Sequence, residues 1–179
     1  MKGFMFTPPS PAKIVLVRCH YESPLGTMTL AASHVGLAGV WFNGQKHMPD
    51  TSQWPLRNDH PVLQRALREL TQYFAGQRRQ FDLPLDLGGG TVFQQQVWRG
   101  LLTINAGEIL SYGGLSQRLG QSAAVRAVGS AVGRNPISII VPCHRVVGAD
   151  GSLTGYAGGL ARKQALLELE RGPQPTMPA

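Results

Sequence analysis

The sequence has few cysteines, no long apolar run and, through much of its second half, almost no acidic residues. Its 179 residues include two cysteines, Cys19 and Cys143, which cannot form a disulfide framework. No apolar run approaches the roughly 18 residues of a membrane-spanning helix. No apolar stretch resembling a secretory signal follows Lys2. We therefore expect a cytoplasmic protein rather than a membrane protein or a disulfide-rich secreted one.

Acidic residues number 10 against 17 lysines and arginines, so the formal net charge is +7. Between residues 91 and 149 the imbalance is larger, because Glu108 is the one carboxylate there and five arginines surround it: Arg99, Arg118, Arg126, Arg134 and Arg145. Arginine without acid predicts an uncompensated positive surface, which is typical of phosphate binding. A solvated surface without a partner is the alternative.

The first half is predicted to be a small sheet with one helix. Three strands are expected at residues 14–18, 27–32 and 37–42, from their β-branched and apolar residues. Pro61 begins a helix whose apolar residues recur at the spacing of a core-facing stripe, and Gly76 ends it. The three glycines at 88–90 read as a linker, so we predict domains at 1–88 and 91–179. The 42% hydrophobic content is enough for two small cores.

The second half is predicted to contain a helix-turn-helix. Thr91 is a plausible N-cap of a first helix, and a second, short helix is expected at 115–119. Gly120 provides a turn, after which Ser122 is expected to cap a third helix. This third helix is rich in Ala, Gly and Ser, which suits close approach to a minor groove better than base readout in a major groove.

Cys143 follows residues 137–141, an apolar run expected to be a strand buried on both sides. Such a cysteine is usually a small hydrophobic residue. Here His144 could act as its base, and the cation of Arg145 would favour thiolate. Because adjacent side chains of an extended chain diverge, Cys143 and His144 could meet only through a bend or a bridging water. Glu170, on a last helix predicted at 162–171, is a candidate to orient the histidine.

These residues carry a family resemblance that covers essentially all of residues 91–171. The segment Pro142–Val146 resembles the active-site signature of the 6-O-alkylguanine-DNA alkyltransferases. Further matching segments occur in the family's order and spacing: 93–98, 111–113, 126–129, 135–136 and 155–160. The first half follows the family more loosely, through residues 23–26 and the hairpin after them. The resemblance implies a small ribonuclease-H-like α/β domain followed by a winged helix-turn-helix-like domain that binds DNA and accepts the alkyl group.

The resemblance also implies an activity, which is the direct repair of 6-O-alkylguanine and, less readily, of 4-O-alkylthymine. The thiolate of Cys143 would take the alkyl group in a single irreversible step. His144 would accept the thiol proton through a water, and Glu170 would hold His144. Tyr112 would donate a hydrogen bond toward the guanine ring.

Other residues of the resemblance would bind DNA or shape the base pocket. Arg126 would fill the gap left by the flipped guanine, and Asn135 would brace the turn that leads to Cys143. The DNA-binding residues would further include Tyr112, Ala127, Ser122 and Gly129. The base pocket would be formed by Val146, Tyr156, Ala157 and Gly158.

We expect no cofactor and no metal, because Cys19, His20 and His34 do not form a convincing four-ligand set. The expected partner is alkylated double-stranded DNA, bound through its minor groove by a monomer, with cooperative binding left open. Two rival functions are a transcriptional regulator and a Cys-His-Glu hydrolase. The regulator would need richer base readout than the third helix offers, and the hydrolase would need an oxyanion hole and repeated turnover.

Overall fold

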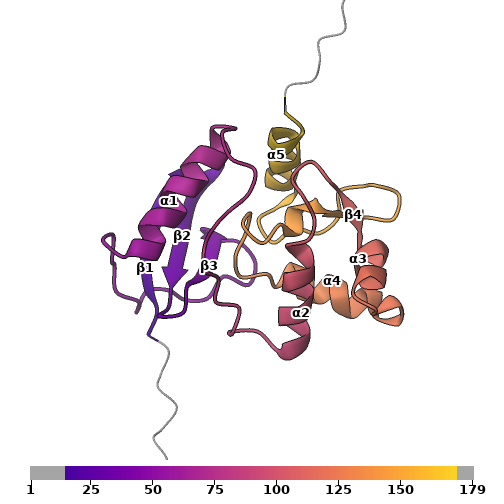
Figure 1. The fold of residues 1–179 in the computed structure, drawn as a ribbon, viewed down its shortest axis with the longest axis horizontal. Coiled ribbons are helices and arrows are strands. Elements are labelled where there is room, and N and C mark those ends of the chain that lie inside the picture. Colours follow the sequence, from indigo (N-terminus) through magenta and orange to yellow (C-terminus); the bar gives the residue numbers. More distant parts are fainter. Residues whose placement is uncertain (1–14, 173–179) are drawn as a thin grey trace, which may run out of the picture.

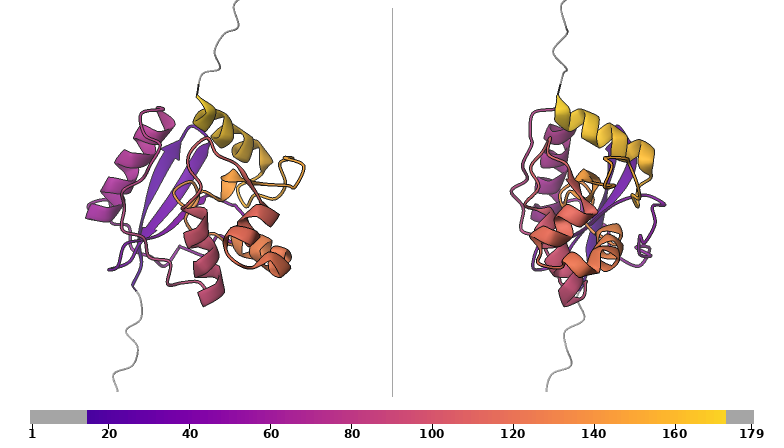
Figure 2. Two further views of the ribbon diagram at one scale, coloured as in Figure 1. Left: turned by 45° about the vertical axis from the view of Figure 1, so that its right-hand side comes forward. Right: turned by 90° about the vertical axis from the view of Figure 1, so that its right-hand side faces the viewer.

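The computed structural model describes residues 15–172, so the outer ends of both predicted domains and the start of the predicted strand 14–18 lie outside the described residues. The chain forms a sheet-and-helix first half and a largely helical second half, which lie side by side in all three views (Figures 1 and 2). No helix within 15–172 is long and apolar enough to cross a membrane.

The first half contains an antiparallel sheet of β1 (Val17–Ser23), β2 (Gly26–Ala32) and β3 (Leu37–Phe42), in that order. The sheet and its last two strands confirm the prediction. The bounds of the first strand were wrong, since β1 runs on to Ser23. Its exposed polar residues have the period of a half-buried strand. A tight turn at Gly26, whose φ is +115°, fixes the pairing of β1 with β2.

Helix α1 (Pro61–Phe74) begins at the predicted proline and covers one face of the sheet (Figure 1). Leu63, Ala66, Leu70 and Tyr73 are its buried apolar and aromatic residues. They recur at the spacing of one helix face, and Gly76 adopts a φ of +72° just after the helix ends. The predicted helix is thus confirmed at both ends.

The second half confirms the helix-turn-helix, formed by α3 (Tyr112–Arg118) and α4 (Val125–Gly133). The predicted bounds of its first helix, 115–119, were wrong, since α3 already begins at Tyr112. Helix α2 (Val92–Leu101) precedes them and carries the predicted cap at Thr91, whose side chain accepts from the backbone N–H of Gln94. The predicted cap at Ser122 is wrong. Ser122 begins a single 3-10 turn, and α4 starts after it without a side-chain cap.

The predicted strand at 137–141 is also wrong, although its residues are buried as expected. The segment is a compact loop in which Ile139 has a φ of +72°, a conformation that β-branched residues rarely adopt. Only its start pairs with a strand. The N–H of Val40 in β3 donates to the carbonyl of Pro136, and the N–H of Ser138 donates back to Val40, at 2.9 Å each. This loop joins the second half to the sheet of the first.

After the loop, Cys143–Arg145 form a 3-10 turn that leads into β5 (Val146–Val147). Strand β5 pairs in parallel with β4 (Leu110–Ser111), directly before the helix-turn-helix. Helix α5 (Leu160–Arg171) then closes the described part of the chain. The turn that carries Cys143 therefore lies between the helix-turn-helix, α5 and the sheet.

Candidate active site beneath the helix-turn-helix

Asn135 holds the loop that precedes Cys143. Its side-chain amide donates to the carbonyl of Val141 at 2.7 Å and to Sγ of Cys143 at 3.1 Å, and its Oδ1 accepts from the N–H of Ile137 at 3.0 Å. A single buried side chain thus bridges both ends of the loop, and this network replaces the ladder of a strand. The predicted bracing residue lies at the position that such a role requires.

Cys143, His144 and Glu170 are all buried, and His144 binds Glu170 directly. A 3-10 turn at Cys143–Arg145 gives the chain a bend there in place of an extended strand. Nε2 of His144 lies 2.7 Å from Oε1 of Glu170. Since an ionised carboxylate can only accept, Nε2 carries the proton and Nδ1 is left as an acceptor. Nδ1 is buried without a hydrogen-bond partner among the described residues, so it is available for a proton.

The sequence predicts that the cation of Arg145 favours the thiolate of Cys143, and the structure gives Arg145 another partner. Its guanidinium binds the carboxylate of Glu170 through two nitrogens, at 2.9 and 2.8 Å, and the charge that lowers the pKa of the thiol comes from Lys163. Burial would raise the pKa of Glu170, but its bonds to His144 and Arg145 hold that pKa well below its usual value. Burial lowers the pKa of His144, and the neighbouring Glu170 opposes this change. At neutral pH the histidine is therefore uncharged beside an ionised carboxylate.

Lys163, from α5, is the cation next to the thiol. Its Nζ is buried and donates to three backbone carbonyls, those of Val146, Thr154 and Gly155. Burial lowers the pKa of Lys163 to about 8. Burial also raises the pKa of Cys143, while the Asn135 amide and the Lys163 charge act in the opposite direction. The pKa of the thiol is therefore raised overall, and Asn135 and Lys163 reduce the size of this rise.

Cys143 lines a cavity of about 200 Å³. The cavity also includes part of the predicted site and two residues from the first half; its lining is Lys46, His47, Tyr112, Gly129, Val132, Gly133, Cys143, Gly155, Tyr156 and Ala157. Val146 and Gly158 are not in this lining. A Cβ at Gly158 would lie 2.8 Å from the ring of Tyr156, so Gly158 permits the close packing behind that ring.

The two tyrosines of the cavity differ in their hydrogen bonds. Tyr112 donates to the backbone carbonyl of Thr154 at 3.1 Å. The hydroxyl of Tyr156 is buried without a partner among residues 15–172. An unpartnered buried hydroxyl beside a cavity indicates a place where a polar ligand atom can bind. Burial raises the pKa of both phenols, which therefore stay protonated and able to donate.

The outer face of the helix-turn-helix carries the predicted DNA-binding residues. Ser122, Arg126 and Ala127 are exposed, and Gly129 lies against the ring of Tyr112. The positive surface is smaller in the structure than the sequence indicated. Arg145 is buried against Glu170, and Arg118 pairs with Glu108 at 3.2 Å, so two of the five arginines are compensated.

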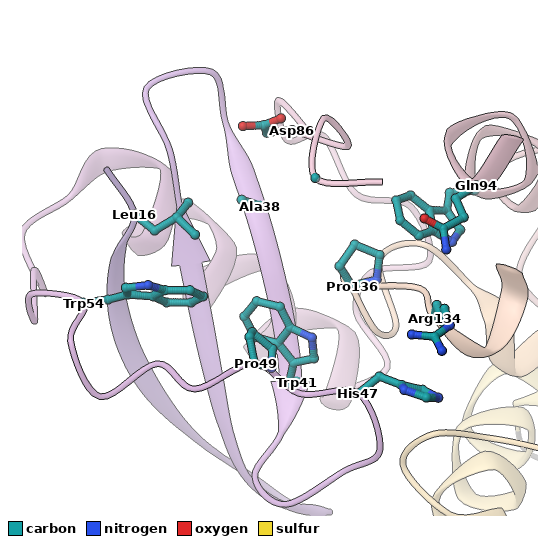
Figure 3. A pocket seen from close by; sticks show the side chains of 12 residues that line it. Leu16, Ala38, Trp41, His47, Pro49, Trp54, Asp86, Gln94, Arg134 and Pro136 are labelled. Carbon is teal, nitrogen blue, oxygen red and sulfur yellow. The ribbon is translucent and has the colours of Figure 1, made fainter. Parts of the chain in front are cut away.

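A second cavity, of about 430 Å³, lies between the sheet and the second half (Figure 3). Trp41, Trp54 and Trp98 all line it, together with Arg134 and Pro136. His47 lines both cavities, but the second contains none of the predicted site residues. Within the described part of the chain, no group of three or more His, Cys, Asp and Glu residues is placed to hold a metal ion.

Sequence reasoning missed three features of the site. Lys163 lies seven residues before Glu170, a spacing that places both on one face of α5, and this signal was available. Tyr73, whose hydroxyl donates to Glu170, and Lys46 come from the first half of the chain. No local pattern links these two residues to Cys143, because the contacts depend on how the two halves pack.

The molecule is thus of the class that presents a cysteine nucleophile beside a helix-turn-helix. Residues 92–172 match the family model described as the 6-O-methylguanine DNA methyltransferase DNA binding domain. Residues 16–87 match the model of the ribonuclease-like domain of the same methyltransferase. The chain therefore belongs to the 6-O-methylguanine DNA methyltransferase family, and the predicted fold class is confirmed.

Individual relatives agree with this assignment. The chain is 48% identical over 159 residues to a methylated-DNA–protein-cysteine methyltransferase of Mycobacterium tuberculosis, covering 87% of this chain and 94% of the relative. A protein of the same description from Haemophilus influenzae is 41% identical over 155 residues, covering 86% of each. The crystal structure of Mycobacterium tuberculosis OGT in complex with DNA is similar, with a TM-score of 0.78 and 47% identity over 88% of this chain and 94% of that one.

Proposed function

We propose that this protein repairs alkylated DNA directly, by transferring the alkyl group of 6-O-alkylguanine, and less readily that of 4-O-alkylthymine, to Cys143. The observation that carries the proposal is the buried thiol that lines the cavity beneath the helix-turn-helix and is followed in the chain by a histidine bound to a carboxylate. Family membership and the DNA-bound relative support it. The reaction is a methylated-DNA–protein-cysteine methyltransfer in which the protein is consumed.

The chemistry needs only groups of this chain and one water molecule. His144 accepts the thiol proton at Nδ1, through a water, and Glu170 stabilises the imidazolium that forms. The Sγ thiolate then attacks the alkyl carbon, forming a C–S bond while the bond from that carbon to the guanine oxygen breaks. The electron pair stays on the base, toward which Tyr112 donates. Because a thioether is a poor leaving group, the thiol is not regenerated and one protein repairs one lesion.

Access to the lesion requires base flipping, since the alkyl group is out of reach inside the duplex. Arg126 fills the gap left in the stack, while Tyr156, Ala157 and the neighbouring backbone enclose the base. The exposed face of α4 around Arg126 has small residues, which favours approach along the minor groove. The protein acts as a monomer, a proposal supported by the fact that thiol, base and carboxylate all come from one chain.

Intact-protein mass after mixing with an oligonucleotide that carries 6-O-methylguanine tests this function. The expected result is a gain of one methyl group per protein, located on Cys143 by peptide mapping. Cys143→Ala should gain none and still bind the lesion DNA, while Cys19→Ala, the matched control, should react normally. Repeated release of product without modification of the protein would refute the proposal and favour a hydrolase.

A further inference from the structure

Glu170 receives a hydrogen bond from the first half of the chain that the chemistry described above does not use. We propose that Tyr73 is a positioning residue that, through Glu170, limits how strongly His144 holds a proton. The inference rests on the proposed function, in which His144 takes the proton of Cys143. It assigns a part in the reaction to α1, an element that lies outside the DNA-binding half.

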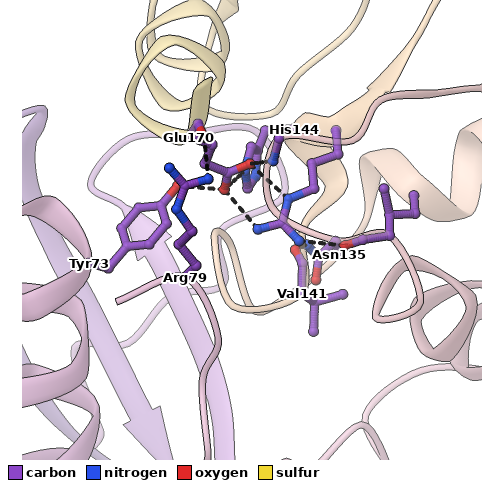
Figure 4. A network of polar contacts seen from close by, with 9 residues as sticks. Tyr73, Arg79, Asn135, Val141, His144 and Glu170 are labelled. Carbon is purple, nitrogen blue, oxygen red and sulfur yellow. Dashed lines mark hydrogen bonds and ion pairs between the residues drawn. The ribbon is translucent and has the colours of Figure 1, made fainter. Parts of the chain in front are cut away.

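The geometry centres on one oxygen atom. Oε1 of Glu170 accepts from Tyr73 Oη at 2.8 Å, from Arg145 Nη2 at 2.8 Å and, at 2.7 Å, from His144 Nε2. Figure 4 shows Tyr73 approaching the carboxylate from α1, on the side opposite His144. Both Tyr73 and Glu170 are buried, so water does not compete for this oxygen.

The phenol is fixed in this position as a donor. Its ring packs against the rings of Phe74 and Phe81, with centroids 5.4 Å away in each pair. Burial and the nearby charge of Glu170 raise the pKa of Tyr73, so its proton stays on the phenol. The side chain of Arg79 adds a second contact from the first half, donating to the backbone carbonyl of Glu170 at 2.8 Å.

Three donors that share one carboxylate oxygen weaken one another. Each draws charge from the oxygen and leaves less of it for the others. The hydroxyl of Tyr73 therefore reduces the negative charge that stabilises an imidazolium at His144. Removing the hydroxyl, while keeping the ring, should make His144 a stronger base and increase the fraction of Cys143 present as thiolate at a given pH.

Other charged and titratable groups face the same centre and are unchanged by this substitution. Around His144 these are Arg145 from the 3-10 turn and Lys163 from α5. Around the thiol they are Lys163 and the phenols of Tyr112 and Tyr156. Since none of them contacts Tyr73 Oη within the described hydrogen-bond network, the effect of the substitution passes through Glu170.

The test is the pH dependence of Cys143 alkylation by iodoacetamide in the full-length protein, followed by peptide mass mapping to separate Cys143 from Cys19. For Tyr73→Phe the midpoint should move about one pH unit lower, the size expected when a charged acceptor loses one of several donors. Tyr21→Phe, near the same helix, should leave the midpoint unchanged. In a Glu170→Gln background, Tyr73→Phe should no longer shift it.

An unchanged or higher midpoint in Tyr73→Phe would overturn the inference and leave the tyrosine a structural residue. If that variant does not fold, a fluorinated tyrosine placed at position 73 replaces it. This stronger donor should move the midpoint higher, and no movement would likewise overturn the inference. Failure of the unmodified protein to accept methyl from DNA would instead refute the proposed function, because the thiol titration does not depend on DNA.

Discussion

Replacing Asn135 by alanine should lower the free energy of unfolding by a large amount, although it removes only one buried polar side chain. The substitution leaves the N–H of Ile137 without its acceptor in a buried loop, at a cost of about 1–3 kcal/mol. It also removes a donor to the carbonyl of Val141, which keeps the N–H of Cys143 as a second partner, so this loss costs only about 1 kcal/mol. The expected decrease in the free energy of unfolding is therefore about 2–4 kcal/mol.

Urea denaturation followed by far-ultraviolet circular dichroism measures this decrease. Asn105→Ala is the control, since Asn105 is exposed in the loop that follows α2 and its loss should change the free energy of unfolding by less than about 0.5 kcal/mol. A decrease below about 1 kcal/mol for Asn135→Ala would refute the reasoning, because the loop would then hold its shape without the brace. The variant should also react with iodoacetamide only at higher pH, since the amide no longer stabilises the thiolate.

Three further predictions concern charge. Because the folded pKa of Glu170 is lowered, its contribution to stability is complete above the unfolded value of about 4.3 and is lost as pH falls below it. Urea titrations between pH 2 and 6 should therefore show that the free energy of unfolding decreases less with falling pH in Glu170→Gln than in the unmodified protein. Equal decreases in the two proteins would contradict this. Arg126→Ala should slow methyl transfer from duplex DNA more than from the free base 6-O-methylguanine, in parallel single-turnover assays; equal slowing would remove its role in flipping. Lys46→Ala, at the cavity mouth, should reduce the salt dependence of lesion-DNA affinity by about one counterion, whereas Arg68→Ala on α1 should not, as fluorescence anisotropy at several salt concentrations would show.

The elements that the sequence predicted well are those whose signals are local. Pro61 and Gly76 mark both ends of α1, and Thr91 with Gln94 forms the box that begins α2. Each signal involves backbone groups within one turn of the helix, so the rest of the molecule has little influence on it. The same reason explains why the helix-turn-helix was predictable from the spacing of its apolar residues.

The loop at 137–141 shows where such reasoning fails. Its five residues are as apolar and β-branched as those of a buried strand, and they are buried. Their conformation, however, is decided by the side chain of Asn135, which replaces strand partners with its own amide. A pattern of apolar residues predicts burial, but it does not predict which groups form hydrogen bonds with the buried backbone N–H and C=O groups.

Cys143, His144 and Glu170 were predicted as candidates from the residues themselves and given roles by the family resemblance, and the structure brings the last two into contact. The role given to Arg145 was wrong, because charge alone does not say which carboxylate a guanidinium will reach. Lys163 could have been identified from helical spacing. The contribution of Tyr73 could not, since Tyr73 and Glu170 are 97 residues apart in the chain and meet only because the two halves pack together.

The three tryptophans of the sequence all line one cavity, the larger one between the sheet and the second half. The protein's intrinsic tryptophan emission therefore samples a single place, the junction of the two halves, and none of its signal originates in the lining of the cavity that holds Cys143. A spectral change on mixing with DNA would report a rearrangement at this junction. An unchanged spectrum would show that DNA can be bound while the two halves keep their arrangement.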